Sequence, residues 1–333
     1  MSVPRQVLAL LLTIYVCQSS AQVYNSERKV RLGEEPWHVS LDVYYGEERS
    51  KKPITSTICS GILLDDRWVL TAAHCIGEHL KQGYSTFKIQ SVYVGVGFVE
   101  NCAGNEGIEA AHWFRHPGYQ KKEISDSGFD IGLIYLNKPV KFCPYVQPAL
   151  DLLASKHHNL MTGTECQVSG WGLHDRSCTA SEVLRSGRVR VLDEKVCRQR
   201  WRENISEKFG VENLSRDFFE RNICAGNNQG VGPAAGQGDS GSALVCADPT
   251  KRGSKFIYGV SSTTIDQEGD CCGKNSKCRG GPETPMIYTK VAHFREWIER
   301  EMKDTKARRG CVATKTSGFV MGVFVGITAV YFL

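Results

Sequence analysis

Short apolar runs separated by turn residues cover most of the chain between about Pro36 and Tyr288. The runs are rich in Val, Ile, Tyr and Thr, and Gly, Asn and Asp interrupt them, which is typical of strands joined by turns. In order they read WHVSLDVYY, TICSGILL, WVLTAAH, SVYVGVGFV, DIGLIYL, ECQVSGWG, GSALVC and FIYGVSS. The pattern predicts an all-β fold.

Two segments depart from the strand pattern. Val291–Met302 has its apolar residues at helical spacing, which predicts a terminal helix that packs by one face. That face comprises Phe294, Trp297, Ile298 and Met302. The stretch 196–219 mixes charged and aromatic residues, and we interpret it as a helix with a surface insertion. Asn204 and Asn213 within it begin Asn-X-Ser sequons, so both are candidate glycosylation sites.

The first residues have the composition of an export signal. Arg5 precedes an apolar run from Val7 to Val16, and small residues follow up to Ala21. The alternative is an N-terminal membrane anchor, but the apolar run is about half of the ~20 residues that span a bilayer. We therefore predict a cleaved signal peptide at residues 1–21, a secreted or surface-anchored protein, and one folded domain at residues 22–303.

A second apolar segment ends the sequence. Residues 304–317 are polar and resemble a stalk, and residues 318–333 read GFVMGVFVGITAVYFL, without any charge. As a spanning helix this tail is short, and its basic flank would face outside the cell, against the usual tendency. We favour a GPI attachment signal with small residues such as Gly310 or Ala313 near the site, and a transmembrane anchor is the alternative. Either interpretation predicts contact with a membrane through the tail.

Charge and cysteine content exclude two other classes. The formal net charge of +5 is spread along the chain, so it gives no reason to expect nucleic acid as a partner. Thirteen of the fourteen cysteines follow Cys17, and in an oxidising compartment they are expected to form disulfides. Cys271, Cys272 and Cys278 have no second Cys or His pair at the spacing of a zinc site, so we expect no metal.

Three separate motifs carry candidate catalytic chemistry. His74 lies in TAAHC beside a cysteine, Asp130 lies at the head of the apolar run DIGLI, and Ser240 lies between glycines in GQGDSGS. A buried carboxylate needs a hydrogen-bond partner. Glycines on both sides of a serine allow a sharp turn that aims backbone N–H groups at one point. Each fragment alone is ambiguous, whereas their order along one chain indicates a common site.

At these residues the chain resembles the chymotrypsin family of serine proteases, over about Tyr24 to Met302. TAAHC, DIGLIYL, SGWG, GDSGS and IYTKV occur in the family's order, and PWHVSL stands near the start. The resemblance implies two orthogonally packed six-stranded Greek-key β-barrels with a C-terminal helix, and an active site in the cleft between them. It also implies a serine endopeptidase that acts on proteins or peptides and needs no cofactor.

The resemblance implies a role for each residue. Ser240 would attack the scissile carbonyl, His74 would accept and return its proton, and Asp130 would orient the histidine. The N–H groups of Gly238 and Ser240 would form the oxyanion hole. Asp239 would receive the ammonium of the mature N-terminus.

The family's disulfides imply three pairs here. These are Cys59 with Cys75, Cys166 with Cys246, and Cys197 with Cys224. The pairing of Cys102, Cys143, Cys178, Cys271, Cys272 and Cys278 stays open, because six cysteines allow 15 connectivities, and Cys311 is left in the tail.

The chain departs from the family at its activation segment. Counting back from Pro36, the segment that should supply the ammonium reads Tyr24-Asn-Ser-Glu27, and no basic cleavage site precedes it. A buried Asp239 without a cation would be costly. This predicts a protease that depends on an activating protein partner, as understood for complement factor B.

The predicted specificity pocket also departs from the family. Ala234 falls at the pocket floor, where a trypsin-like enzyme has aspartate, so a preference for Lys or Arg is not expected. We assign the walls to the run from Ser261 to Thr263 and to Met286, and methionine in place of glycine favours small aliphatic side chains or blocks the pocket. Gly236 replaces a cysteine of one common pocket disulfide.

Two non-enzymatic functions remain as alternatives. A catalytically silent homologue of the same fold could act as a binding or scaffold protein, which the altered N-terminus and pocket favour. A carbohydrate-binding β domain has only the strand pattern to support it, and it leaves GDSGS unexplained.

Overall fold

The computed structural model describes residues 28–46, 55–77, 79–80, 86–96, 107–119, 128–156, 158, 160–172, 181–202, 216–226, 238–248, 253–264 and 285–317. Several predictions fall on other residues and lie outside the described part. They are the signal peptide at 1–21, the activation segment Tyr24-Asn-Ser-Glu27, the apolar tail at 318–333, the pocket floor at Ala234, Gly236, the sequons at Asn204 and Asn213, and Cys102, Cys178, Cys271, Cys272 and Cys278.

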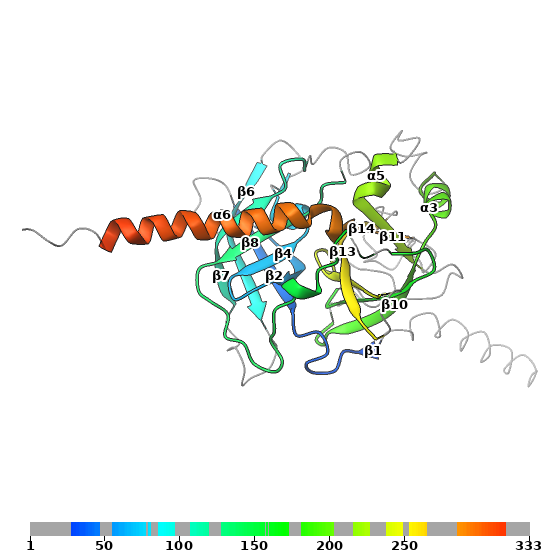
Figure 1. Cartoon of the computed structure of the whole chain (residues 1–333), viewed down its shortest axis with the longest axis horizontal. Coiled ribbons are helices and arrows are strands. Elements are labelled where there is room, and N and C mark those ends of the chain that lie inside the picture. The colour runs from blue at the N-terminus through cyan, green and yellow to red at the C-terminus, as the bar shows by residue number, and fades with distance from the viewer. Residues whose placement is uncertain are drawn as a thin grey trace, which may run out of the picture. The chain divides into compact units, whose positions relative to one another are not determined.

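The first half of the chain forms one closed antiparallel barrel (Figure 1). Its strands follow the order β2-β3-β4-β8-β7-β6, and pairing of β2 with β6 closes the ring, while β5 extends it beside β6. The bounds are β2 His38–Gly46, β3 Thr55–Leu63, β4 Trp68–Thr71, β5 His79–Leu80, β6 Thr86–Val96, β7 Ile108–Arg115 and β8 Gly132–Leu136.

The second half repeats this architecture. Strands β9-β10-β11-β14-β13-β12 form a closed ring through the pairing of β12 with β9, and β1 pairs with the first two residues of β10. The bounds are β1 Arg28–Lys29, β9 Glu165–Gly170, β10 Arg185–Val191, β11 Asn222–Gly226, β12 Ala243–Ala247, β13 Lys255–Thr264 and β14 Met286–Lys290. The predicted fold of two six-stranded barrels is therefore confirmed.

The alternation of side chains explains why these runs fold as barrel strands. In β2, every second residue is buried, and Val39, Leu41 and Val43 are fully inaccessible to solvent. The residues between them face outward and are partly exposed. Strand β8 is buried along its whole length, so its run GLIYL is apolar throughout. Each barrel thus has its own hydrophobic interior.

Helices are few in the described part of the chain. They are the short 3-10 helices η2 (Ala73–Ile76) and η3 (Leu150–Leu152), and α3 (Glu194–Trp201), α5 (Arg216–Arg221) and α6 (Val291–Ser317). Asp193 caps α3, because its side chain accepts a hydrogen bond from the Lys195 amide at 2.8 Å. Both α3 and α5 lie in or beside the stretch 196–219, where one helix was predicted.

The predicted terminal helix is present but longer than expected. The chain divides into two compact units at His293 and Phe294, and α6 continues to Ser317 instead of ending near Met302. The four residues of its predicted apolar face are buried, with exposed fractions of 5% or less. Helix formation therefore includes the polar residues that we predicted to be a stalk. Among the residues described, we find no helix that combines the length and the apolarity needed to cross a bilayer.

Candidate active site

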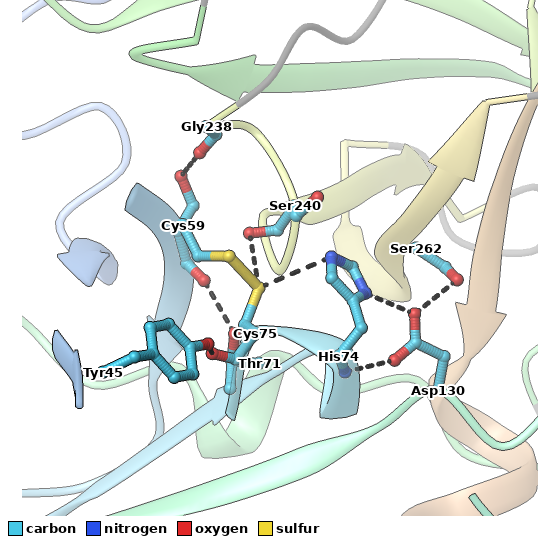
Figure 2. The surroundings of a disulfide bond; sticks show 10 residues. Tyr45, Cys59, Thr71, His74, Cys75, Asp130, Gly238, Ser240 and Ser262 are labelled. Carbon is cyan, nitrogen blue, oxygen red and sulfur yellow. Dashed lines mark hydrogen bonds and ion pairs between the residues drawn. A yellow bond between two sulfur atoms is a disulfide. The ribbon is translucent and has the colours of Figure 1, made fainter. Parts of the chain in front are cut away.

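His74 lies in η2, directly after strand β4, and its position is fixed from two directions. The neighbouring Cys75 forms a disulfide with Cys59 of β3. The His74 amide donates to Asp130 Oδ1 at 2.8 Å, and His74 Nδ1 lies 2.7 Å from Asp130 Oδ2 (Figure 2). With Nδ1 held by the carboxylate, Nε2 is the ring nitrogen left to exchange a proton with a reactant.

Asp130 lies two residues before β8 and is held by the second barrel as well as by the first. Ser262 Oγ donates to Asp130 Oδ2 at 2.6 Å (Figure 2), and Thr289 Oγ1 donates to the Asp130 carbonyl at 2.8 Å. The sequence analysis included Ser262 in the pocket wall, but it predicted neither Ser262 nor Thr289 as a partner of Asp130. Ser262 occupies a bulge between Ser261 and Thr263 in the pairing of β13 with β14, and a bulge re-aims the side chain of the extra residue.

The pair His74–Asp130 shifts both pKa values. Burial opposes ionisation of the carboxyl, but the charge of His74 and hydrogen bonds from His74 and Ser262 outweigh it, so the pKa of Asp130 lies below its usual value. Burial also disfavours the imidazolium, but Asp130 outweighs this effect and raises the pKa of His74. The pair therefore favours a charged carboxylate that stabilises a protonated imidazole.

Ser240 lies on a tight turn before β12. The Ser242 amide donates to the Asp239 carbonyl at 3.0 Å, and the Gly241 amide donates to the Ser261 carbonyl at 2.8 Å. Gly238 and Gly241 have φ angles of +102° and +88°, in the region that favours glycine. The glycines on both sides of the serine thus make this turn possible.

The structure brings the nucleophile candidate to the histidine. Figure 2 shows Ser240 beside the imidazole of His74, and Cys75 Sγ lies 3.7 Å from both His74 Nε2 and the Ser240 carbonyl oxygen. Among the described residues no hydrogen bond joins the Ser240 hydroxyl to His74. Such bonds are often long in enzymes without substrate and tighten in the complex.

Two backbone amides on this turn are available to a ligand. Within the described part of the chain, neither the Gly238 nor the Ser240 N–H donates a hydrogen bond to protein. An amide without an acceptor on an ordered turn is what an oxyanion hole requires. These are the two donors that the family resemblance implied.

The carboxylate of Asp239 points away from the nucleophile, toward the end of β9. Asp239 Oδ1 accepts a hydrogen bond from the Gly172 amide at 2.8 Å. A Cβ atom at Gly170 would lie 1.8 Å from the same oxygen, and one at Gly172 would lie 2.6 Å from it. The motif SGWG therefore has glycines where the Asp239 carboxylate needs space.

The predicted pocket residues lie on neighbouring strands of the second barrel. Met286 of β14 is 1% exposed and accepts a hydrogen bond from Tyr288 Oη at 3.4 Å through its sulfur. Ser261 and Thr263 pair with β14 at Tyr288 and Ile287, on either side of the Ser262 bulge.

The three disulfides implied by the resemblance are all present. They join Cys59 to Cys75, Cys166 to Cys246, and Cys197 to Cys224. Cys143 is also disulfide-bonded, to a cysteine outside the described residues. Cys59, Cys75 and His74 are close enough to suggest a metal site, but the two sulfurs are bonded to each other and cannot act as thiolates.

Two barrels with a His–Asp pair next to a glycine-flanked serine define the architecture of a serine protease. The sequence model of the Trypsin family matches residues 24–298, and the chain belongs to this family. A solved structure of mouse neuropsin, a serine protease expressed in the limbic system of the brain, is similar to it at 26% sequence identity with a TM-score of 0.54. That match covers 83% of this chain and 98% of neuropsin.

Proposed function

We propose that the protein is a serine endopeptidase that cleaves peptide bonds through an acyl-enzyme intermediate. The observation that carries the proposal is the 2.7 Å contact between His74 Nδ1 and Asp130 Oδ2, next to the turn that carries Ser240. Family membership alone is compatible with inactive homologues. The intact set of nucleophile, base and orienting carboxylate favours the active form.

In the proposed mechanism, Ser240 Oγ attacks the carbonyl carbon while His74 Nε2 takes its proton. Asp130 stabilises the imidazolium through Nδ1, and the N–H groups of Gly238 and Ser240 stabilise the oxyanion. The tetrahedral intermediate collapses when His74 gives the proton to the leaving amine. Water then attacks the Ser240 ester with His74 as base, which releases the acid product and restores the serine.

A fluorophosphonate probe tests the proposal, because it forms a covalent bond only with an activated serine. We expect the wild type to be labelled and Ser240→Ala to be silent. Ser181→Ala is a suitable control, because Ser181 is buried and its hydroxyl donates to the Val183 carbonyl at 2.6 Å, outside the site. Absence of labelling in the wild type with every candidate partner present would favour the scaffold function.

The substrate preference that we propose is for small aliphatic side chains before the scissile bond. Ala234 lacks the charge that would bind Lys or Arg, and the buried Met286 occupies a position where the family often has glycine. Profiling with a peptide library tests this. Met286→Gly should extend cleavage to larger side chains, and a wild type that prefers Lys or Arg would contradict the proposal.

We also propose that full activity depends on a protein partner. Support comes from the sequence, since Tyr24-Asn-Ser-Glu27 departs from the Ile-Val-Gly-Gly start of the family and no basic cleavage site precedes it. Sequencing of the mature N-terminus and assay of the purified protein alone test this. Full-rate peptide cleavage without a partner would refute it.

We propose that the protein is extracellular, with a signal peptide at 1–21 and a GPI anchor attached near Gly310 or Ala313 in place of the apolar tail. The presence of disulfides fits an oxidising compartment. Phosphatidylinositol-specific phospholipase C should release the protein from cells. Retention after treatment would favour the transmembrane alternative.

A further inference from the structure

A buried serine on β3 contacts the turn that carries the candidate nucleophile. Ser60 follows Cys59, has an exposed fraction of 0%, and therefore cannot contact a substrate. Its carbonyl accepts a hydrogen bond from Thr71 Oγ1 of the neighbouring strand β4 at 2.8 Å. Ser60 is thus fixed within the first barrel, whereas the turn belongs to the second.

Ser60 donates two hydrogen bonds to this turn. Its amide donates to the Ser240 carbonyl at 2.7 Å, and its hydroxyl donates to the Gly238 carbonyl at 2.9 Å. Figure 2 shows the second of these bonds ending at Gly238. One residue therefore holds carbonyl groups on both sides of Asp239.

The Gly238 and Ser240 carbonyls belong to peptide units that alternate along the turn with the units that carry the two oxyanion donors. The Gly238 and Ser240 N–H groups lie on the peptide units 237–238 and 239–240. The unit between them, 238–239, is the one that the Ser60 hydroxyl holds, and the following unit, 240–241, is the one that the Ser60 amide holds. The angle between the two donors depends on the orientation of the unit that separates them.

The turn needs such support because its glycines can adopt many backbone conformations. Gly238 has a φ of +102°, and a residue without Cβ passes readily between alternative peptide orientations. At Gly241 the packing against Ser60 is close, since a Cβ there would lie 2.1 Å from the Ser60 carbonyl oxygen. The backbone at Ser60 thus limits the position of the turn, and the hydroxyl selects one orientation of the 238–239 peptide.

We propose that the Ser60 hydroxyl is a positioning group for the oxyanion hole, an inference that rests on the proposed function. It acts through the Gly238–Asp239 peptide and keeps the Gly238 and Ser240 amides aimed at one point. Because these amides bind the oxyanion more strongly than the ground-state carbonyl, loss of the hydroxyl should lower kcat and leave KM nearly unchanged.

The test compares Ser60→Ala with the control Ser181→Ala, each of which removes one buried hydroxyl that donates to a carbonyl. For Ser60→Ala we expect kcat to fall about 10- to 100-fold, less than the loss of a whole oxyanion donor. The affinity for a peptide boronic acid, a mimic of the tetrahedral intermediate, should fall by the same factor. Ser181→Ala should keep both values within about twofold of wild type, whatever its loss in thermal stability.

A readout without turnover separates this inference from the proposed function. In hydrogen exchange with mass spectrometry, the amides of residues 238–242 should exchange faster in Ser60→Ala than in wild type or Ser181→Ala. If the wild type cleaves no peptide with any candidate partner present, the protease proposal is refuted. Faster exchange in Ser60→Ala than in that wild type would still support the positioning role. An active enzyme whose kcat and exchange are unchanged by Ser60→Ala, or in which only KM rises, would overturn the inference.

Discussion

Asp130 is held by groups from both halves of the chain. The amide and ring of His74 contact its carboxylate from the first barrel, and Ser262 donates to it from the second. These bonds fix the carboxylate against His74 Nδ1. The histidine therefore has a defined tautomer and a defined ring orientation.

We predict that Asp130→Asn abolishes most activity without unfolding the protein. The amide keeps the shape of the carboxylate but can present an N–H to Nδ1, which selects the wrong tautomer of His74. The expected loss in kcat is about 10,000-fold, by analogy with the family's template. Steady-state kinetics with titrated active sites measure it, and near-ultraviolet circular dichroism reports on the fold. A loss below about tenfold would argue against this role.

The pH dependence of the wild type follows from the raised pKa of His74. His74 must be neutral to act as a base, so activity should rise with pH and reach half its maximum above the usual histidine value of about 6.5. In Asp130→Asn the negative charge is absent, so the midpoint should move down. The kcat/KM profile between pH 5 and 9 measures both midpoints, and a wild-type midpoint below that of the variant would contradict the prediction.

The sequence predicted His74, Asp130 and Ser240 because each lies in a local motif with a known family order. It did not predict the roles of Ser60, Ser262 and Thr289. Their hydrogen bonds join segments that are far apart in the chain, and no local pattern marks them. For Ser262 the bulge in β13 also determines the direction of the side chain, and bulges are not visible in a run such as VSSTT.

Among the elements, the segment between β1 and β2 is attached to β9 through a buried carboxylate. Glu35 accepts hydrogen bonds from Ser169 Oγ and Gln167 Nε2, each at 2.5 Å, and its other oxygen lies 3.4 Å from His38 Nδ1. Burial opposes ionisation of Glu35, but His38 and the two donors outweigh it and lower the pKa. This carboxylate connects the approach to the first barrel with a strand of the second.

We predict that Glu35→Ala destabilises the protein by about 3 kcal/mol at pH 7, because it leaves buried donors without a partner. The neighbouring Glu34 is the matched control, since its ion pair with Arg28 is partly exposed and worth at most about 1 kcal/mol. Urea unfolding measures both variants. Equal losses at the two positions would contradict the burial argument.

Acid should weaken the same contact. The pKa of Glu35 is lower in the folded chain than in the unfolded one, so its contribution to stability is present above about pH 4.3 and is lost as the pH falls through the folded value. Unfolding midpoints between pH 3 and 6 should therefore decline more steeply in wild type than in Glu35→Gln. Parallel curves would exclude this carboxylate as the cause.

Strand positions were predictable from alternation and β-branched residues, whereas the end of α6 was not. The apolar period stops at Met302, but Lys, Ala and Arg continue to Arg309, and these residues favour helix without needing a buried face. A hydrophobic pattern alone therefore predicts the part of a helix that carries apolar residues at helical spacing and misses the part that continues on intrinsic helix propensity.

At the scale of the whole molecule, disulfides close loops of different lengths. Cys166–Cys246 spans 80 positions in sequence and Cys59–Cys75 spans 16. Loop-closure entropy then predicts losses of about 4.5 and 3 kcal/mol when each is replaced by alanines. We expect a larger loss of stability for the first pair and a larger loss of activity for the second, whose sulfur lies 3.7 Å from His74 Nε2. Unfolding curves measure the loss of stability in the two double variants, and steady-state kinetics measure the loss of activity. Each variant serves as the control for the other.

The closure of the barrels and the order of their strands were not accessible from alternation. Periodicity predicts that a segment is a strand, but pairing of β2 with β6, or of β12 with β9, depends on contacts between residues far apart in the chain. Those expectations came from the family resemblance. The structure provides the registers that make the two rings closed.

The general base and the nucleophile come from separate barrels, with His74 after β4 and Ser240 before β12. A small slip of one barrel against the other would therefore separate the reacting groups while leaving both sheets hydrogen-bonded. Catalytic turnover should therefore be lost at a lower temperature or urea concentration than the one at which the far-ultraviolet circular dichroism signal of the strands is lost.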